Sequence, residues 1–160
     1  MDKGKLVEEL LEKPYRVVDF LPEQVPEGSA GQFFAVEKYY MDPERMKGFR
    51  KKFADILIRL NCYFDFSVCE AQEDVFTDNP DPEWLEEKIL ENADLCVLLP
   101  GEETLVTLYR DDLYMTVYNA CGSVLKRLEQ LAEAEELFVR SKQCHRKAMT
   151  NSDFRIQNAE

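Results

Sequence analysis

Hydrophobic and polar positions follow two different periods along this chain, and the changes between them mark the predicted elements. The clearest helical pattern begins after Asp42 and Pro43, a capping residue followed by a proline suited to a first helical turn. Apolar residues then recur at intervals of three and four: Met46, Phe49, Phe53, Ile56, Leu57 and Leu60. This pattern predicts a helix with one buried stripe over residues 43–60.

Three further segments have the pattern of helices. Residues 3–12 form a short amphipathic segment with four aliphatic residues on one side. Asp81 and Pro82 repeat the cap and proline signal and open a helix over residues 81–92. A last helix is predicted over residues 120–135 from its spaced aliphatic residues.

Strands are predicted between these helices. Residues 62–69 alternate apolar and mostly polar side chains, with Cys62 on the apolar side, as in a half-buried strand. The stretch 22–31 is rich in proline and glycine and is typical of turns. The other predicted strands cover residues 15–21, 32–40, 95–99 and 137–140.

Residues 104–118 have the pattern of a β-hairpin that turns at Asp111 and Asp112. A two-residue turn there makes partners of positions whose numbers sum to 223. The pairing then sorts the side chains into two faces. One face is aliphatic and holds Val106, Val117, Leu108 and Met115. The other holds Leu105, Thr107, Tyr109, Tyr114, Thr116 and Tyr118.

The order of these elements predicts an α+β fold, a single mixed and largely antiparallel sheet packed with three or four helices. We expect one domain over residues 1–142. From residue 143 to residue 160 the chain is polar with few apolar residues, and we expect a frayed or disordered tail there.

Charge and cysteine content narrow the class of function. The chain has 32 acidic and 20 basic residues, a net charge of -12, which disfavours nucleic acid and anionic lipid as partners. Its longest purely aliphatic or cysteine run, Leu95 to Leu99, is far short of the ~20 residues that cross a membrane. Five cysteines, an odd number without C-x-x-C spacing, favour reduced thiols and a cytoplasmic location.

Candidate catalytic chemistry is sparse in the sequence. The only histidine, His145, lies in the polar C-terminal stretch, and no glycine-rich phosphate motif is present. We therefore predict no catalytic residue, cofactor or resident metal. Cys121, at the start of the last predicted helix, is either a nucleophile activated by the helix N-terminus or a small packed residue.

An acidic segment stands out between Asp65 and Glu87, with nine carboxylates and no basic residue. It is either a solvated surface, a docking surface for a basic protein, or a metal or carboxylate site built from Asp74, Asp78 and Asp81. The basic residues of 44–59 also have two interpretations. They form either an anion-binding site or ion pairs with the acidic residues of the chain, with Lys51 and Asp55 as one i,i+4 pair.

The hypothesis that these patterns favour is a non-enzymatic protein-binding module with a basic protein as partner. Tyrosines supply both contact area and a hydrogen bond, so the hairpin face is a candidate anchor unless a helix of the same domain covers it. The alternative is a small enzyme or metal-binding domain that uses the three aspartates above or Cys121. The predicted partner-binding residues are Tyr109, Tyr114, Thr116, Tyr118, Glu73, Asp74 and Asp78.

Overall fold

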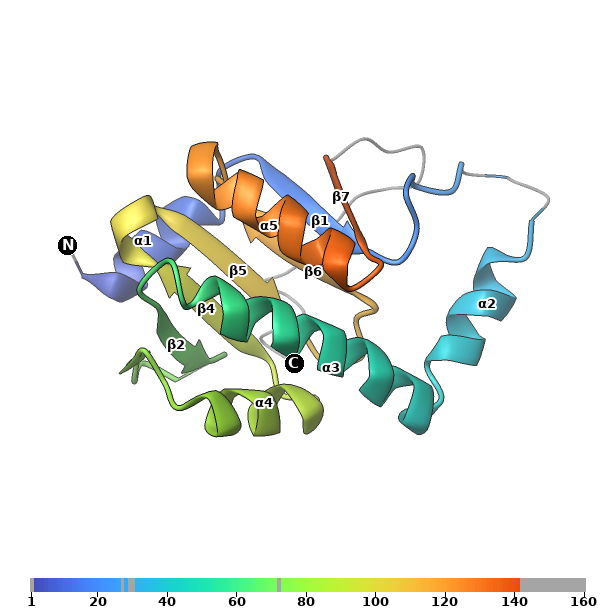
Figure 1. Ribbon diagram of the computed structural model, residues 1–160, viewed down its shortest axis with the longest axis horizontal. Coiled ribbons are helices and arrows are strands. Elements are labelled where there is room, and N and C mark those ends of the chain that lie inside the picture. The colour runs from blue at the N-terminus through green and yellow to red at the C-terminus, as the bar shows by residue number, and fades with distance from the viewer. Residues whose placement is uncertain (1, 27, 29–30, 72, 142–160) are drawn as a thin grey trace.

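The computed structural model describes residues 2–26, 28, 31–71 and 73–141, and within them seven strands form one antiparallel sheet (Figure 1). Neighbouring strands follow the order β3-β2-β4-β5-β6-β1-β7. The α+β class and the single, largely antiparallel sheet are therefore confirmed. The strands are β1 (Tyr15–Asp19), β2 (Ser67–Glu70), β3 (Thr77–Asp78), β4 (Leu95–Leu99), β5 (Thr104–Leu108), β6 (Tyr114–Tyr118) and β7 (Phe138–Ser141).

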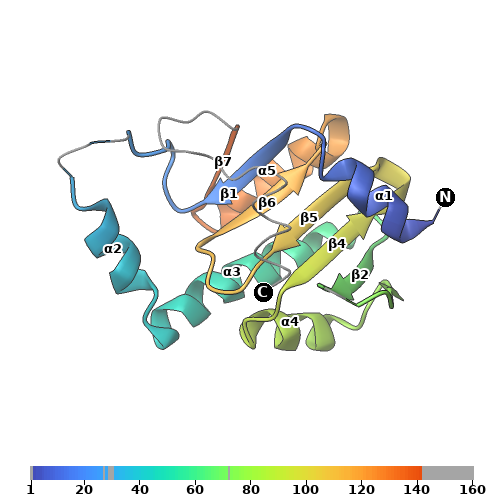
Figure 2. The same ribbon diagram turned by 180° about the vertical axis from the view of Figure 1, so that it is seen from behind.

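Helices cover both faces of this sheet. On one face lie α3 (Pro43–Leu60), α4 (Pro82–Leu90) and α5 (Gly122–Ala134). The view from behind shows α1 (Lys3–Leu10) on the other face (Figure 2). Helix α2 (Phe33–Tyr40) projects from the body near the start of α3, and a 3-10 turn, Pro100–Glu102, joins β4 to β5.

The larger core lies between the three-helix layer and the sheet. Phe53, Ile56 and Leu57 of α3 are completely buried there, in one core with side chains such as Val97 of strand β4. The predicted stripe of α3 is thereby confirmed. Its start is fixed as the sequence indicates, because the Asp42 carboxylate accepts a hydrogen bond from the backbone amide of Arg45.

A second, smaller core lies under α1. Leu10 is 2% exposed and packs with side chains from β2, β4, β5 and β6. Because successive residues of a strand point to opposite faces, the strands alternate between the two cores. The residues of this smaller core are Leu10, Cys69, Cys96, Leu98, Leu105, Tyr109 and Tyr118.

The register of the β5–β6 hairpin is the predicted one. Val106 pairs with Val117 and Thr107 with Thr116, as positions that sum to 223 must. The turn itself differs from the prediction. The amide of Asp112 donates to the carbonyl of Tyr109 at 3.2 Å, and Asp111 has a φ of 65°, so Arg110 and Asp111 occupy the turn centre.

The strand predicted over residues 32–40 is wrong, because this segment forms helix α2. Its aromatic and β-branched residues favour a strand by composition. However, Glu37 and Lys38 stand next to each other between two apolar pairs, an order that a period of two does not allow. The segment also pairs with no described strand.

The strand predicted over residues 62–69 begins later, at Ser67. After α3 the chain continues in turns, since the amides of Cys62 and Tyr63 donate to the carbonyls of Arg59 and Leu60 at 3.0 Å. Cys62 is consequently exposed, not in the core as its position in the alternating pattern suggested. The tail predicted over residues 143–160 lies outside the described residues. Among the described helices, none combines the length and apolar character that a membrane span requires.

Candidate functional site

The tyrosine-rich face of the hairpin lies on the side of the sheet that α1 covers. Tyr109, Thr116 and Tyr118 are buried, and Tyr114 is half-buried. The ring of Tyr15 from β1 packs on Tyr118 with a centroid separation of 5.4 Å. In this conformation the three buried side chains offer no contact area to another protein, and their role as anchors stays a prediction.

The acidic partner-binding candidates occupy the exposed edge of the sheet around β3. Glu73 and Asp74 are exposed in the loop after β2. Asp78 accepts hydrogen bonds from Nζ of Lys3 at 2.7 Å and from Oγ of Ser67 at 2.6 Å. The bond from Lys3 is the main cause that lowers the pKa of Asp78. Asp78 therefore links the start of α1 to the sheet edge.

The alternative site residues are dispersed over separate local structures. Asp81 caps α4 and accepts a hydrogen bond from the amide of Glu83 at 2.8 Å, whereas Asp78 accepts hydrogen bonds from Lys3 and Ser67. Across the described ranges, no three His, Cys, Asp or Glu side chains are grouped so as to hold a metal ion. Cys121 is exposed at the N-cap of α5 and makes no side-chain capping bond.

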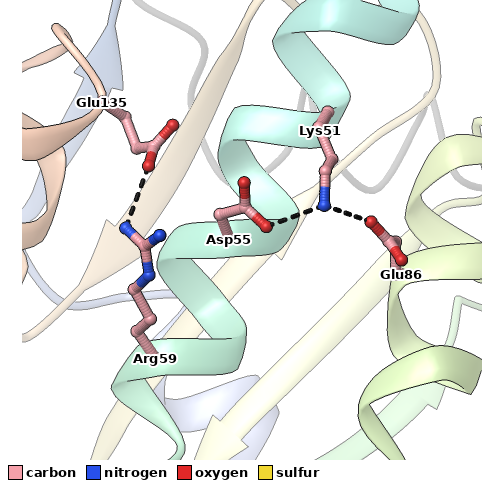
Figure 3. A network of polar contacts seen from close by, with 5 residues as sticks. All are labelled: Lys51, Asp55, Arg59, Glu86 and Glu135. Atoms are coloured by element: carbon pink, nitrogen blue, oxygen red, sulfur yellow. Dashed lines mark hydrogen bonds and ion pairs between the residues drawn. The ribbon is translucent and has the colours of Figure 1, made fainter.

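Two basic residues of α3, Lys51 and Arg59, pair with acidic residues of their own chain (Figure 3). Lys51 bonds to Asp55 at 3.0 Å, the predicted i,i+4 pair, and also to Glu86 of α4. These hydrogen bonds, first that to Glu86, raise the pKa of Lys51. Arg59 reaches Glu135 at the end of α5, at 3.0 Å. These contacts support pairing with the acidic excess over an anion site.

Arg50 belongs to the same basic segment but has a different environment, which the sequence interpretation missed. It is 1% exposed and donates to three backbone carbonyls, those of Ile89 at 2.8 Å, Ala93 at 2.9 Å and Tyr109 at 3.0 Å. The signal was present, because Arg50 lies four residues after Met46 and three before Phe53, on the buried stripe itself.

The hairpin turn places carboxylates next to this guanidinium. Burial lowers the pKa of Arg50 to about 10, and the charge of Asp112 is the largest influence in the opposite direction. Burial also raises the pKa of half-buried Asp112 to about 7, against the effect of Arg50. Asn92 fixes the turn further through hydrogen bonds with Asp111 at 2.7 and 3.0 Å. Together, the hydrogen bonds of Arg50 and Asn92 connect α3 and the end of α4 to the hairpin.

The most conspicuous exposed feature is helix α2. None of its eight residues is buried. Phe34 is 82% exposed, and three further large apolar residues are also exposed, namely Val36, Tyr39 and Met41 at the helix end. At 100° per residue these side chains point to more than one side of the helix. The helix therefore presents apolar contact area around much of its circumference.

Aromatic contacts hold the base of α2 to the body. Tyr40 packs edge-on against Phe49 of α3, with a centroid separation of 4.9 Å, and against Phe20 at 5.4 Å. The guanidinium of Arg45 lies 3.9 Å from the centroid of the Tyr39 ring. These contacts fix the end of α2 that joins α3 and leave its first turn without buried side chains.

A solvent-open pocket of about 660 Å³ lies between the end of α5 and β7. Its apolar part includes Leu137 and Phe138, and Pro22 comes from the segment that leads from β1 toward α2. Acidic side chains line it as well: Glu129, Glu133 and Glu136. A lining that combines carboxylates with apolar side chains suits the long aliphatic stem and cationic head of a lysine or arginine.

With the α+β sheet, the projecting helix and the acidic pocket described, the chain was compared with known proteins. No family model, curated protein or solved structure matches it.

Proposed function

We propose that this chain is a non-enzymatic protein-binding module that inserts helix α2 into an apolar groove of a basic partner protein. The observation that carries the proposal is the exposure of α2, whose Phe34 is 82% exposed on a helix with no buried residue. An amphipathic or apolar helix bound in a groove is a recurrent mode of protein recognition.

The energetics of a short helix support this role. Helices below about 12 residues are marginally stable in water on their own, and most helical stability in proteins comes from packing. None of the eight residues of α2 is buried, although Tyr39 and Tyr40 contact the body through Arg45, Phe49 and Phe20. Enclosure by a partner would bury Phe34, Tyr39 and Met41, and each large apolar side chain contributes about 1.5–3 kcal/mol when fully buried.

The negative net charge of the chain favours a basic protein as the partner. The molecule carries a net charge of -12, which attracts and steers a basic protein. The acidic pocket beside α5 offers a second contact of the same sign, suited to lysine or arginine. A second copy of this chain brings another -12, so long-range repulsion disfavours self-association. The odd number of cysteines, with four free ones in the described part, fits work in the reducing cytoplasm.

The first test compares two variants that each place a carboxylate on an exposed apolar residue. Phe34→Asp alters α2, and Val75→Asp alters an exposed residue of the loop before β3 as the matched control. Both positions are exposed, so thermal unfolding of the two variants should resemble that of the unchanged protein. Immobilised wild-type, Phe34→Asp and Val75→Asp proteins are incubated with the same cell extract, and each protein recovered is purified and titrated against all three.

We expect the wild-type protein and Val75→Asp to bind the same basic protein, with an affinity that falls as salt rises. Phe34→Asp should weaken this binding at least tenfold, because a carboxylate in an apolar groove loses its hydration. Equal binding by all three proteins would overturn the role of α2. A recovered partner that is acidic, or self-association of the wild-type protein that Phe34→Asp abolishes, would overturn the assignment of a basic partner.

A further inference from the structure

Cys69 and Cys96 stand directly opposite each other on neighbouring strands. They are register partners in the antiparallel β2–β4 pair and belong to the same small core under α1. Both are free thiols, 7% and 9% exposed. Because they are register partners on the same face of the sheet, their side chains both enter this core.

The backbone geometry of this pair suits a covalent bond. Directly opposite residues of antiparallel strands have Cα atoms about 4.5–5.5 Å apart. Disulfides join residues whose Cα atoms are about 4.4–6.8 Å apart, so a bond between these sulfurs requires side-chain rotation and little movement of the strands. The other described cysteines, Cys62 and Cys121, lie on the exposed turn after α3 and at the start of α5, and neither has a cysteine as strand partner.

The two thiols shift each other's pKa in opposite directions. A hydrogen bond between them lowers the pKa of Cys69. The same hydrogen bond raises the pKa of Cys96, and burial adds to the rise. The carboxylates of Asp74 and Glu73 act against ionisation of Cys69 to a smaller extent.

Cys69 lies nearer to the edge of the sheet than Cys96 does, because β2 is the second strand from that edge and β4 the third. The outer strand β3 is only two residues long and pairs with Ser67 and Val68. At Cys69 the outer side of β2 therefore has no paired strand among the described residues. The partly buried Phe76, on the loop that precedes β3, packs against the same core.

We propose that Cys69 and Cys96 form a modification site, a dithiol that a low-molecular-weight disulfide such as oxidised glutathione converts into a cross-strand disulfide. In the first step the Cys69 thiolate attacks one sulfur of the small disulfide, whose S–S bond breaks and releases one small thiolate. In the second step the Cys96 thiol loses its proton to solvent, and its sulfur attacks the Cys69 sulfur and displaces the second small thiolate. Both cysteines are oxidised, and the small disulfide takes up the two electrons.

The disulfide would fasten β2 to β4 beside the acidic loop 71–76. The disulfide would close the chain segment from Cys69 to Cys96 into a loop. This loop restricts the unfolded state, so the oxidised protein should melt at a higher temperature. This site is independent of the proposed role of α2, which lies at the opposite end of the molecule (Figure 2).

The experiment uses the full chain with Cys62, Cys121 and Cys144 replaced by serine. The protein is incubated with oxidised glutathione at pH 8, free thiols are counted by alkylation, and the product is mapped by mass spectrometry. Cys96→Ser and Cys69→Ser in the same background separate the two steps. Circular dichroism establishes that each variant folds, and Cys96→Ala and Cys69→Ala replace any serine variant that does not.

We expect the two-cysteine protein to lose both thiols and the mass of two hydrogen atoms, and to melt several degrees higher until a reductant reverses the change. Cys96→Ser should stop at a glutathione mixed disulfide on Cys69, and Cys69→Ser should react much more slowly. The proposal is overturned if both thiols stay free in the folded protein, if only mixed or intermolecular disulfides form, or if Cys96 alone reacts as fast as Cys69 alone.

Discussion

At the scale of single residues, Arg50 joins three segments through hydrogen bonds to the carbonyls of Ile89, Ala93 and Tyr109. Arg50→Met keeps an apolar stem of similar length but leaves these buried carbonyls without a donor. We expect the free energy of unfolding to fall by about 3 kcal/mol or more, as measured by urea denaturation. Arg50→Lys should cost almost as much, because one ammonium does not reproduce the planar fork of the guanidinium.

The matched control for this prediction is Lys47→Met on the same helix. Lys47 is exposed, and the same loss of charge there should change stability by no more than about 0.5 kcal/mol. If Arg50→Met and Lys47→Met unfold at the same urea concentration, the buried hydrogen bonds of Arg50 do not contribute to stability as described.

Asp112 gives the hairpin turn a pH dependence whose direction follows from its pKa of about 7. The unfolded chain releases this proton near pH 4, so between about pH 4 and 7 the folded state binds more protons than the unfolded state. The contribution of Asp112 to stability is therefore greatest below that range and is lost as the pH rises through 7. Asp112→Asn, which does not ionise, should raise the melting temperature at pH 8 by a few degrees and raise it clearly less at pH 5, where part of the loss has already occurred.

Melting curves of the wild-type protein and Asp112→Asn from pH 5 to pH 8 measure this difference directly. Asp111→Asn is the control, since Asp111 is exposed in the same turn. A difference between wild type and Asp112→Asn that does not change with pH would contradict the assignment.

At the scale of elements, the end of α5 is strained by its sequence. The amide of Leu137 donates to the carbonyl of Ala132 at 2.8 Å, and that of Glu136 to Glu133 at 3.0 Å, the hydrogen bonds of a Schellman motif. Glu136 adopts a left-handed φ of 61° there, where glycine is the usual residue. Glu136→Gly should raise the free energy of unfolding by about 0.5–1 kcal/mol, because the lower backbone strain exceeds the entropy that glycine adds to the unfolded chain.

Glu136→Ala separates backbone strain from charge, since it removes the carboxylate and keeps a side chain in the left-handed conformation. We expect its stability to stay within about 0.5 kcal/mol of wild type in urea denaturation. If the alanine variant gained as much as the glycine variant, the charge at the helix end would be the cause.

Elements that carry their own signals were predictable from the sequence. Helix α3 has a cap, a proline and a continuous stripe, and the hairpin register follows from the two-face alternation of β5 and β6. Helix α2 was not predictable from the sequence, because its aromatic residues have strand propensity. Contacts of Tyr40 with Phe49 and Phe20 hold this helix to the body, and no local pattern reveals them.

At the scale of the whole molecule, the sequence shows the acidic character of the protein but not which surfaces are exposed. The burial of Tyr118 depends on the docking of α1 onto the second face of the sheet, a long-range contact. The same contact places Cys69 and Cys96 under one helix. These cysteines are 27 positions apart in the sequence and become partners only when β2 pairs with β4, so local spacing does not reveal the pair. The exposure of α2 could not be predicted, because its segment was predicted to be a strand.

The two outermost strands of the sheet also affect how copies of the protein meet. On one side β3 is two residues long and its Asp78 is held by Lys3, and on the other side β7 is four residues long and its Arg140 pairs with Asp19 of β1. Such short edge strands offer little backbone to which a strand from another copy could add. The short edge strands thereby disfavour the addition of strands into fibrils. The protein can therefore expose the aromatic side chains of α2 to water without forming amyloid.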